Sequence, residues 1–202
     1  HTANRRQRQM CIRDSFMLSQ WAEEAGIPAG VFNVVHGLGS EAGQAIVEHP
    51  QIKAISFTGG TSTGAHIART TAPQFKKLSL ELGGKNPAII FEDCDFDKAV
   101  STTLRSSFAN QGQICLCSSR ILIQDKLYDR FKNALVEKVK RMRIGDPADA
   151  ATKMGAVVSQ AHRDKILSSI NNAKEAGGTI LCGGDEAEAP NERCRNGFFV
   201  QP

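Results

Sequence analysis

The hydrophobic and polar positions of the first 83 residues alternate between helical periodicity and short apolar runs. Apolar side chains from Phe16 to Ala25 fall on one face of a predicted helix, which Gly26 and Pro28 end. After this helix the sequence predicts buried strands at 31–35, 53–57 and 77–82, separated by helices at 40–48 and 61–70. Strands that alternate with short helices predict βαβ units and a mostly parallel sheet.

A second unit with the same alternation follows Gly83 and Gly84. It has apolar side chains at steps of four between Leu127 and Val139, which predict an amphipathic helix. The sequence predicts strands at 88–91, 120–124 and 179–182 and helices at 96–109, 126–142 and 160–176. We therefore expect an α/β protein with one domain at 15–83 and another at 84–202.

Composition places the chain among globular proteins, with 41% hydrophobic and 23% charged residues. No apolar run approaches the roughly 18 residues that a membrane helix needs. The basic N-terminus is not followed by the apolar segment of a secretory signal. We expect no membrane association and a cytoplasmic location.

Most of the net charge of +4 comes from the N-terminal segment. Four arginines between Arg5 and Arg13 against Asp14 place +3 within the first 15 residues, so the rest is nearly neutral. This segment has no helical amphipathicity and resembles translated adapter sequence, and we expect residues 1–14 to be a non-native leader. A basic arm that binds nucleic acid is the alternative, but we expect no nucleic-acid partner.

The six cysteines do not form a metal-binding pattern, because the sequence has no Cys-x-x-Cys and no histidine pair at ligand spacing. We expect no metal. The cysteines of such a chain are expected to be reduced, and several are expected to be small apolar residues. The histidines, including His66, are assigned no role.

Two residues carry candidate chemistry. Cys115 ends the segment Asn-Gln-Gly-Gln-Ile-Cys, and Glu81 lies 34 residues before it in Leu-Glu-Leu-Gly-Gly-Lys. A thiol nucleophile and a carboxylate, each next to a glycine-rich bend, predict covalent thiol chemistry followed by activation of water. The alternatives are a buried small apolar residue for Cys115 and a surface carboxylate at a strand end for Glu81.

Together these two segments resemble the signature motifs of the NAD(P)-dependent aldehyde dehydrogenase superfamily. The resemblance implies the second half of a Rossmann-like NAD-binding domain at 15–83 and part of an α/β catalytic domain at 84–202, because the family's members are much longer. It also implies that Cys115 attacks an aldehyde and forms a thiohemiacetal and then a thioester. Glu81 would activate the water that hydrolyses the thioester, and the backbone N–H of Cys115 would stabilise the oxyanion.

The glycines of residues 57–64 indicate a cofactor site at a strand-to-helix turn. Glycine lets the backbone approach a pyrophosphate, and a helix N-terminus favours its charge. The candidates are Gly59, Gly60 and Gly64, although the family usually has serine where this chain has Gly60. The resemblance places Gly39 and Gly43 near the adenine and Leu82 near the nicotinamide. It implies NAD as the cofactor and leaves NADP open.

The segments around Cys115 and Lys85 look most like those of the 2-aminomuconic and 2-hydroxymuconic semialdehyde dehydrogenases. A betaine-aldehyde or general aliphatic dehydrogenase is the near alternative. An acylating dehydrogenase that passes the thioester to coenzyme A, or a non-catalytic relative, is the alternative from another class. The resemblance implies a small-molecule aldehyde substrate and a homo-oligomer, either dimer or tetramer. We expect the fragment alone to have little or no activity.

Overall fold

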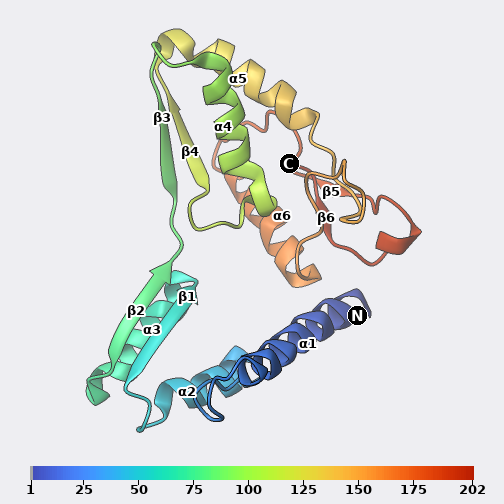
Figure 1. The fold of residues 1–202 in the computed structure, drawn as a ribbon. Helices are drawn as coiled ribbons and strands as arrows, with labels where there is room; N and C mark the ends of the chain where they lie inside the picture. Colours follow the sequence, from blue (N-terminus) through green and yellow to red (C-terminus); the bar gives the residue numbers. More distant parts are fainter. Residues whose placement is uncertain (1) are drawn as a thin grey trace. The chain divides into compact units, whose positions relative to one another are not determined.

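The computed structural model describes residues 2–202, and the side chains of residues 13–202 (Figure 1). The chain forms two compact units, of which the first ends at Gly83 and the second runs from Gly84 to Pro202. Each unit is described by itself.

The first unit begins with a helix that is longer than the sequence predicted. Helix α1 spans Thr2–Glu24, whereas the apolar pattern predicted a helix from Phe16. The residues before Phe16 include arginine, glutamine and methionine, which have high helix propensity and can continue a helix without an apolar stripe. The segment before Phe16 is therefore helical although its sequence lacks helical amphipathicity. The assignment of residues 1–14 as a leader stays a prediction.

The first sheet is a parallel pair. Strands β1 (Ala54–Gly59) and β2 (Lys77–Leu82) pair from Ala54 opposite Lys77 to Gly59 opposite Leu82. Between and before them lie a π-helical turn η1 (Gly39–Gly43) and the helices α2 (Gln44–Glu48), α3 (Thr61–Thr71) and η2 (Ala72–Gln74). Val47, Ile55 and Ile67 form the core that joins α2, β1 and α3. This core fixes the β1–α3 turn beside α2.

The strand predicted at 31–35 is absent. These residues form an irregular segment in which Val31 is 71% and Val35 is 66% exposed. A strand needs a neighbour for its backbone hydrogen bonds, and within the described residues β1 and β2 pair only with each other. Residues 31–35 have the apolar composition of a strand, but no described strand pairs with them.

The second unit contains another parallel pair, β3 (Asn86–Ile90) and β4 (Ser118–Ile123). The other elements of this unit are α4 (Phe96–Phe108), η3 (Ala109–Gly112), α5 (Asp125–Lys140), α6 (Gln160–Glu175), β5 (Glu186–Ala187), η4 (Glu192–Cys194) and β6 (Phe199–Val200). Val100, Leu127 and Phe131 form the core between α4 and α5. The parallel β–helix–β arrangement of both units confirms the predicted α/β class.

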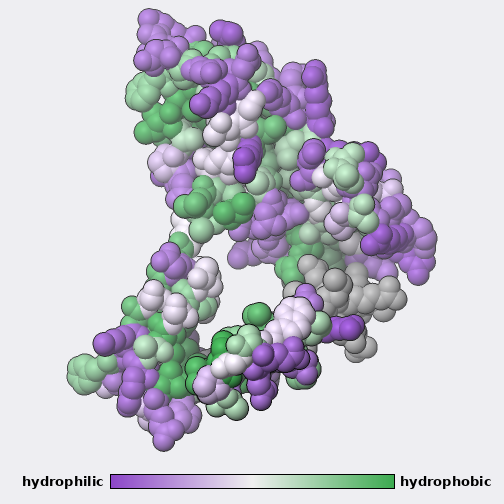
Figure 2. Space-filling model, viewed as in Figure 1, coloured by the Kyte–Doolittle hydropathy of each residue, from purple (hydrophilic) through white to green (hydrophobic). Residues whose placement is uncertain are grey.

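The strand predicted at 179–182 is also absent. Ile180 and Leu181 are partly exposed and line an apolar cavity of about 530 Å³ together with Ile166 of α6. In the described residues no strand pairs with this segment. The apolar side chains contact the cavity, but the backbone does not join a sheet. Hydrophobic surface is exposed on both units (Figure 2).

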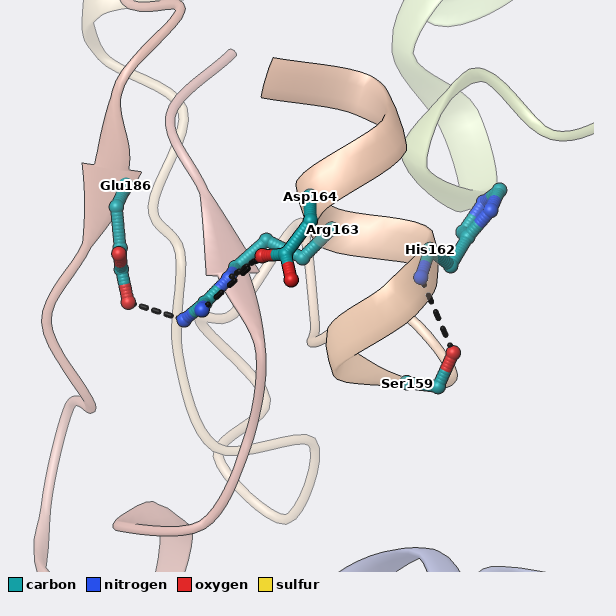
Figure 3. Close-up of polar contacts among 5 residues, drawn as sticks. All are labelled: Ser159, His162, Arg163, Asp164 and Glu186. Carbon is teal, nitrogen blue, oxygen red and sulfur yellow. Dashed lines mark hydrogen bonds and ion pairs between the residues drawn. The ribbon is translucent and has the colours of Figure 1, made fainter. Parts of the chain in front are cut away.

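Helix α6 is held at its N-terminus by side-chain contacts (Figure 3). The Ser159 hydroxyl caps the helix by accepting a hydrogen bond from the His162 N–H at 3.2 Å. Arg163 forms ion pairs with Asp164 on the same helix and with Glu186 on β5. Its side chain is 16% exposed, and these contacts join α6 to the β5–β6 hairpin.

Candidate active site

Cys115 lies on a tight turn between α4 and β4. The N–H of Cys117 donates to the carbonyl of Ile114 at 2.9 Å, so Cys115 and Leu116 are the two central residues of this turn. Three residues immediately upstream have positive φ, at 49° for Asn110, 54° for Gln111 and 69° for Gly112. Such a backbone is costly for residues other than glycine and persists where its surroundings hold it. The segment 110–112, which leads into the Cys115 turn, therefore has a constrained backbone.

Cys115 is the exposed thiol among the cysteines whose side chains are described. Cys117 is buried, and Cys94, Cys182 and Cys194 are partly buried. Burial raises the pKa of the Cys194 thiol, and the nearby Asp146 carboxylate raises it further, which disfavours the reactive thiolate. The alternative reading of Cys115 as a buried apolar residue does not fit this exposure.

The backbone around Cys115 is arranged to leave a donor available. The Cys115 carbonyl accepts a hydrogen bond from the Asn86 side chain at 2.7 Å. Within the described part of the chain, the Cys115 N–H has no acceptor. An exposed thiol and a free N–H on the same residue are what attack on a carbonyl and stabilisation of its oxyanion require.

Glu81 lies on β2, opposite Thr58 of β1. Its side chain is exposed, and no donor among the described residues binds its carboxylate. The next residue, Leu82, packs over Gly64 of α3. Glu81 belongs to the first unit and Cys115 to the second.

A cavity of about 710 Å³ lies in the first unit, between η1, α2, β1 and α3. Two of the predicted cofactor residues, Gly39 and Gly43, line it. A Cβ added to either glycine would meet no atom within 4 Å, so the backbone at both positions is open to a ligand. The volume lies within the range of small-molecule and cofactor sites, about 300–1,000 Å³.

Gly59 and Gly60 lie at the β1–α3 turn, and Gly64 lies in the first turn of α3. Leu82 ends β2, and none of these four predicted cofactor residues lines the cavity. Gly60 is the residue before α3 and has open space where a side chain would be. Gly59 ends β1, and Gly64 is buried against Leu82. The N-terminus of α3 follows Gly60 directly, so its free N–H groups are available to an anion at this turn.

Sequence analysis missed a polar contact at the cavity. His66 of α3 lines the cavity, and its Nε2 lies 2.8 Å from the Oε1 of Gln44 on α2. The Gln44 amide in turn donates to Glu48 at 2.6 Å. Because the Gln44 nitrogen faces a carboxylate, its oxygen faces His66, and Nε2 is the donor. A lone histidine in the sequence gave no signal of this, since the partners lie on another helix.

The described residues show neither a metal-binding cluster nor a membrane-spanning helix. No group of three or more His, Cys, Asp or Glu side chains gathers in a form that could hold a metal ion. No helix in the part that the structure describes is both long and apolar enough to cross a membrane.

Comparison with known families gives a match over nearly the whole chain. Residues 13–202 match the model of the aldehyde dehydrogenase family. The residues outside this match are among those that the sequence predicted as a leader.

Known proteins similar to the chain include two enzymes named for 2-aminomuconic semialdehydes. The 2-aminomuconic semialdehyde dehydrogenase of Bos taurus is 46% identical over 190 residues, covering 93% of this chain and 39% of the relative. The 2-aminomuconic 6-semialdehyde dehydrogenase of a Pseudomonas species is 46% identical over 187 residues, covering 92% and 38%. The chain thus spans about two fifths of the length of these relatives.

The fold of the chain is also similar to that of a solved dehydrogenase structure. The crystal structure of betaine aldehyde dehydrogenase from Staphylococcus aureus in complex with NAD+ superposes with a TM-score of 0.88 at 40% identity. The match covers 93% of this chain and 37% of that structure.

Proposed function

Because the chain belongs to the aldehyde dehydrogenase family, we propose that the whole protein oxidises an aldehyde to a carboxylic acid with NAD+ as the hydride acceptor. The observation that carries this proposal is Cys115, an exposed thiol on a constrained turn whose own N–H is free.

The first step is attack on the aldehyde by the Cys115 thiolate. A bond forms between Sγ and the carbonyl carbon, and the electron pair of the C=O bond moves to the oxygen. The free N–H of Cys115 would donate to this oxyanion. One such donor contributes about 10²- to 10³-fold to the rate. The product is a thiohemiacetal with a hydrogen on a tetrahedral carbon.

The cofactor would occupy the first unit. The open glycines Gly39 and Gly43 and the cavity beside them suit the adenosine part. The open backbone at Gly60, which follows Gly59 and precedes α3, suits the pyrophosphate. Leu82 would lie toward the nicotinamide. When bound, NAD+ accepts the hydride that leaves the thiohemiacetal carbon, and a thioester remains on Cys115. The Staphylococcus aureus relative that was solved with NAD+ supports this choice.

The last step is hydrolysis of the thioester, which we assign to Glu81. Its carboxylate would take a proton from water as the water oxygen attacks the acyl carbon, and the C–S bond then breaks to release the acid and the Cys115 thiolate. General-base assistance is typically worth about 10²- to 10⁴-fold. The exposed carboxylate without a partner supports this role. Its presence also favours hydrolysis over transfer of the acyl group to coenzyme A.

The substrate that we propose is a muconic-type semialdehyde. This rests on the two relatives at 46% identity, which are named for 2-aminomuconic semialdehyde. We further propose a cytoplasmic protein, because the described cysteines are free, as is usual in a reducing compartment. We also propose that the whole protein is a homo-oligomer, either dimer or tetramer, as the family resemblance implies.

Steady-state turnover of the whole protein tests the proposal. Cys115→Ala should abolish NADH formation from the semialdehyde, while Glu81→Gln should leave one stoichiometric burst of NADH and suppress later turnover. Cys182→Ala is the control, because it removes a partly buried thiol far from the turn in sequence. Steady turnover by Cys115→Ala would refute the mechanism.

A further inference from the structure

Asn86 makes two hydrogen bonds to the turn that carries Cys115. Its side-chain nitrogen Nδ2 lies 2.7 Å from the carbonyl oxygen of Cys115 and 3.1 Å from that of Cys117. A carboxamide NH₂ has two N–H donors, so each carbonyl can take one. Both groups belong to the second unit, and the contact spans 29 residues of sequence.

The side chain is needed there because the backbone ladder is interrupted. Strands β3 and β4 change register between Asn86 and Pro87, since Asn86 is opposite Ser118 whereas Pro87 is opposite Arg120. Proline has no N–H to donate to a neighbouring strand, and a register change leaves ladder positions unpaired. At this end of the sheet the Asn86 amide supplies the donors that the backbone lacks.

The other contacts near the turn bind different groups. The Ser107 hydroxyl donates to the Ser118 carbonyl at 2.9 Å, which fixes the start of β4 rather than the turn. Arg120 donates through Nε to the Lys85 carbonyl at 3.0 Å, which fixes the segment before β3. Asn86 is the side chain that binds the carbonyl of the nucleophile residue itself.

We propose that Asn86 is a positioning residue that orients the Cys115 turn for attack on the aldehyde. The inference rests on the proposed function and adds a residue to it. A peptide unit is planar and trans, so holding the Cys115 carbonyl fixes the plane between Cys115 and Leu116. This fixes the backbone of Cys115 on its C-terminal side and limits the directions in which Sγ and the free N–H can face. In this proposal Asn86 acts through the backbone of Cys115.

Two variants and one matched control test the proposal. Asn86→Ala removes both donors, and Asn86→Asp keeps the shape but presents a carboxylate that can only accept, toward two carbonyl oxygens. Arg120→Ala is the control, because it removes one hydrogen bond at the same strand end without touching the turn. Circular dichroism and thermal melting of each variant define the conditions under which it is folded.

The first measurement uses the 202-residue chain and iodoacetamide, with peptide mass mapping. Losing two hydrogen bonds should increase the fraction of molecules in which the turn is open by about tenfold. The alkylation rate of the buried Cys117 should rise by the same factor. The exposed Cys115 should be alkylated at a similar rate in all variants. Protection of Cys117 that is the same in Asn86→Ala and Arg120→Ala would overturn the proposal.

The second measurement uses the whole protein and separates kcat from KM. A misplaced nucleophile should lower kcat by up to about 100-fold, while KM should change little, because the proposed role of Asn86 is confined to the backbone of the Cys115 turn. A residue with a merely structural role would lower the melting temperature and leave kcat per folded molecule unchanged, which would overturn the proposal.

The proposed function and the positioning role of Asn86 can be refuted separately. If Cys115→Ala retains turnover, the proposed function fails, but alkylation of Cys117 still tests the contact. If turnover depends on Cys115 and the Asn86 variants keep full kcat, the positioning role fails while the proposed function stands.

Discussion

Gly64 of α3 and Leu82 of β2 are in direct contact. A Cβ placed on Gly64 would lie 2.6 Å from the Leu82 Cδ2 and 2.9 Å from its Cδ1. In this packing of α3 against the end of β2, next to Glu81, a side chain at residue 64 has room only if the Leu82 side chain shifts. The glycine that the sequence assigned to cofactor binding thus has a packing role in the described structure.

Gly64→Ala should destabilise the first unit by about 1–2 kcal/mol, because the added methyl group overpacks the contact with Leu82. In a Leu82→Ala background the same change should be neutral, or stabilising by up to about 1 kcal/mol, since alanine favours the helix. Amide hydrogen exchange in α3 and β2 of the four proteins of this cycle measures the coupling. Equal effects of Gly64→Ala in both backgrounds would show that the contact is unimportant.

Phe131 of α5 is fully buried, with 0% exposure, in the core between α4 and α5. Phe131→Ala should reduce the free energy of unfolding of the second unit by about 3–5 kcal/mol, because it leaves a cavity. Phe91→Ala is the control in the same unit, since Phe91 is 61% exposed and its loss should cost about 0.5 kcal/mol or less. Urea denaturation followed by circular dichroism compares them, and similar losses would contradict this view of the core.

Asp146 should make the second unit sensitive to acid. The Ala148 N–H, at 2.9 Å, and the Asn191 side chain, at 3.2 Å, lower the pKa of the Asp146 carboxyl below its usual range, with Arg193 contributing at longer range. A carboxyl whose pKa is lower in the folded state stabilises the fold above the unfolded pKa of about 3.9, and this is lost as the pH falls through the folded pKa.

Asp146→Asn should therefore lower the melting temperature at pH 7, and its difference from the unmodified chain should shrink below about pH 4. Asp129→Asn is the control, because the Asp129 side chain is 83% exposed. Melting curves between pH 7 and pH 3 provide the comparison. A difference that is constant over this range would exclude a role for the Asp146 charge.

Sequence patterns correctly predicted the ranges of elements that pack or pair with other elements of the chain. Strand β2 coincides with the predicted range 77–82, and α6 ends one residue before its predicted end at 176. The failures, at 31–35 and 179–182, are apolar runs whose composition suits a strand, but pairing depends on which other strands are present. Local composition does not contain that information.

The candidate site also has features that the sequence predicted and features that it could not predict. The motif around Cys115 predicted a thiol on a bend, and the structure places Cys115 on an exposed turn, while its reactivity stays a prediction. The Asn86 contact could not be predicted, because it depends on a register change between β3 and β4. Likewise, the contact of His66 with Gln44 joins two helices whose packing is set by the core around Val47 and Ile67.

Trapping the acyl intermediate tests the central claim, that Cys115 is the nucleophile and Glu81 the base, most directly. The whole protein carrying Glu81→Gln would be incubated with NAD+ and the semialdehyde, quenched in acid and mapped by peptide mass spectrometry. The account predicts an acyl adduct on the peptide containing Cys115, in near-stoichiometric amount, and none in a Cys115→Ala, Glu81→Gln double variant. An adduct on another cysteine, or turnover without any adduct on Cys115, would contradict it.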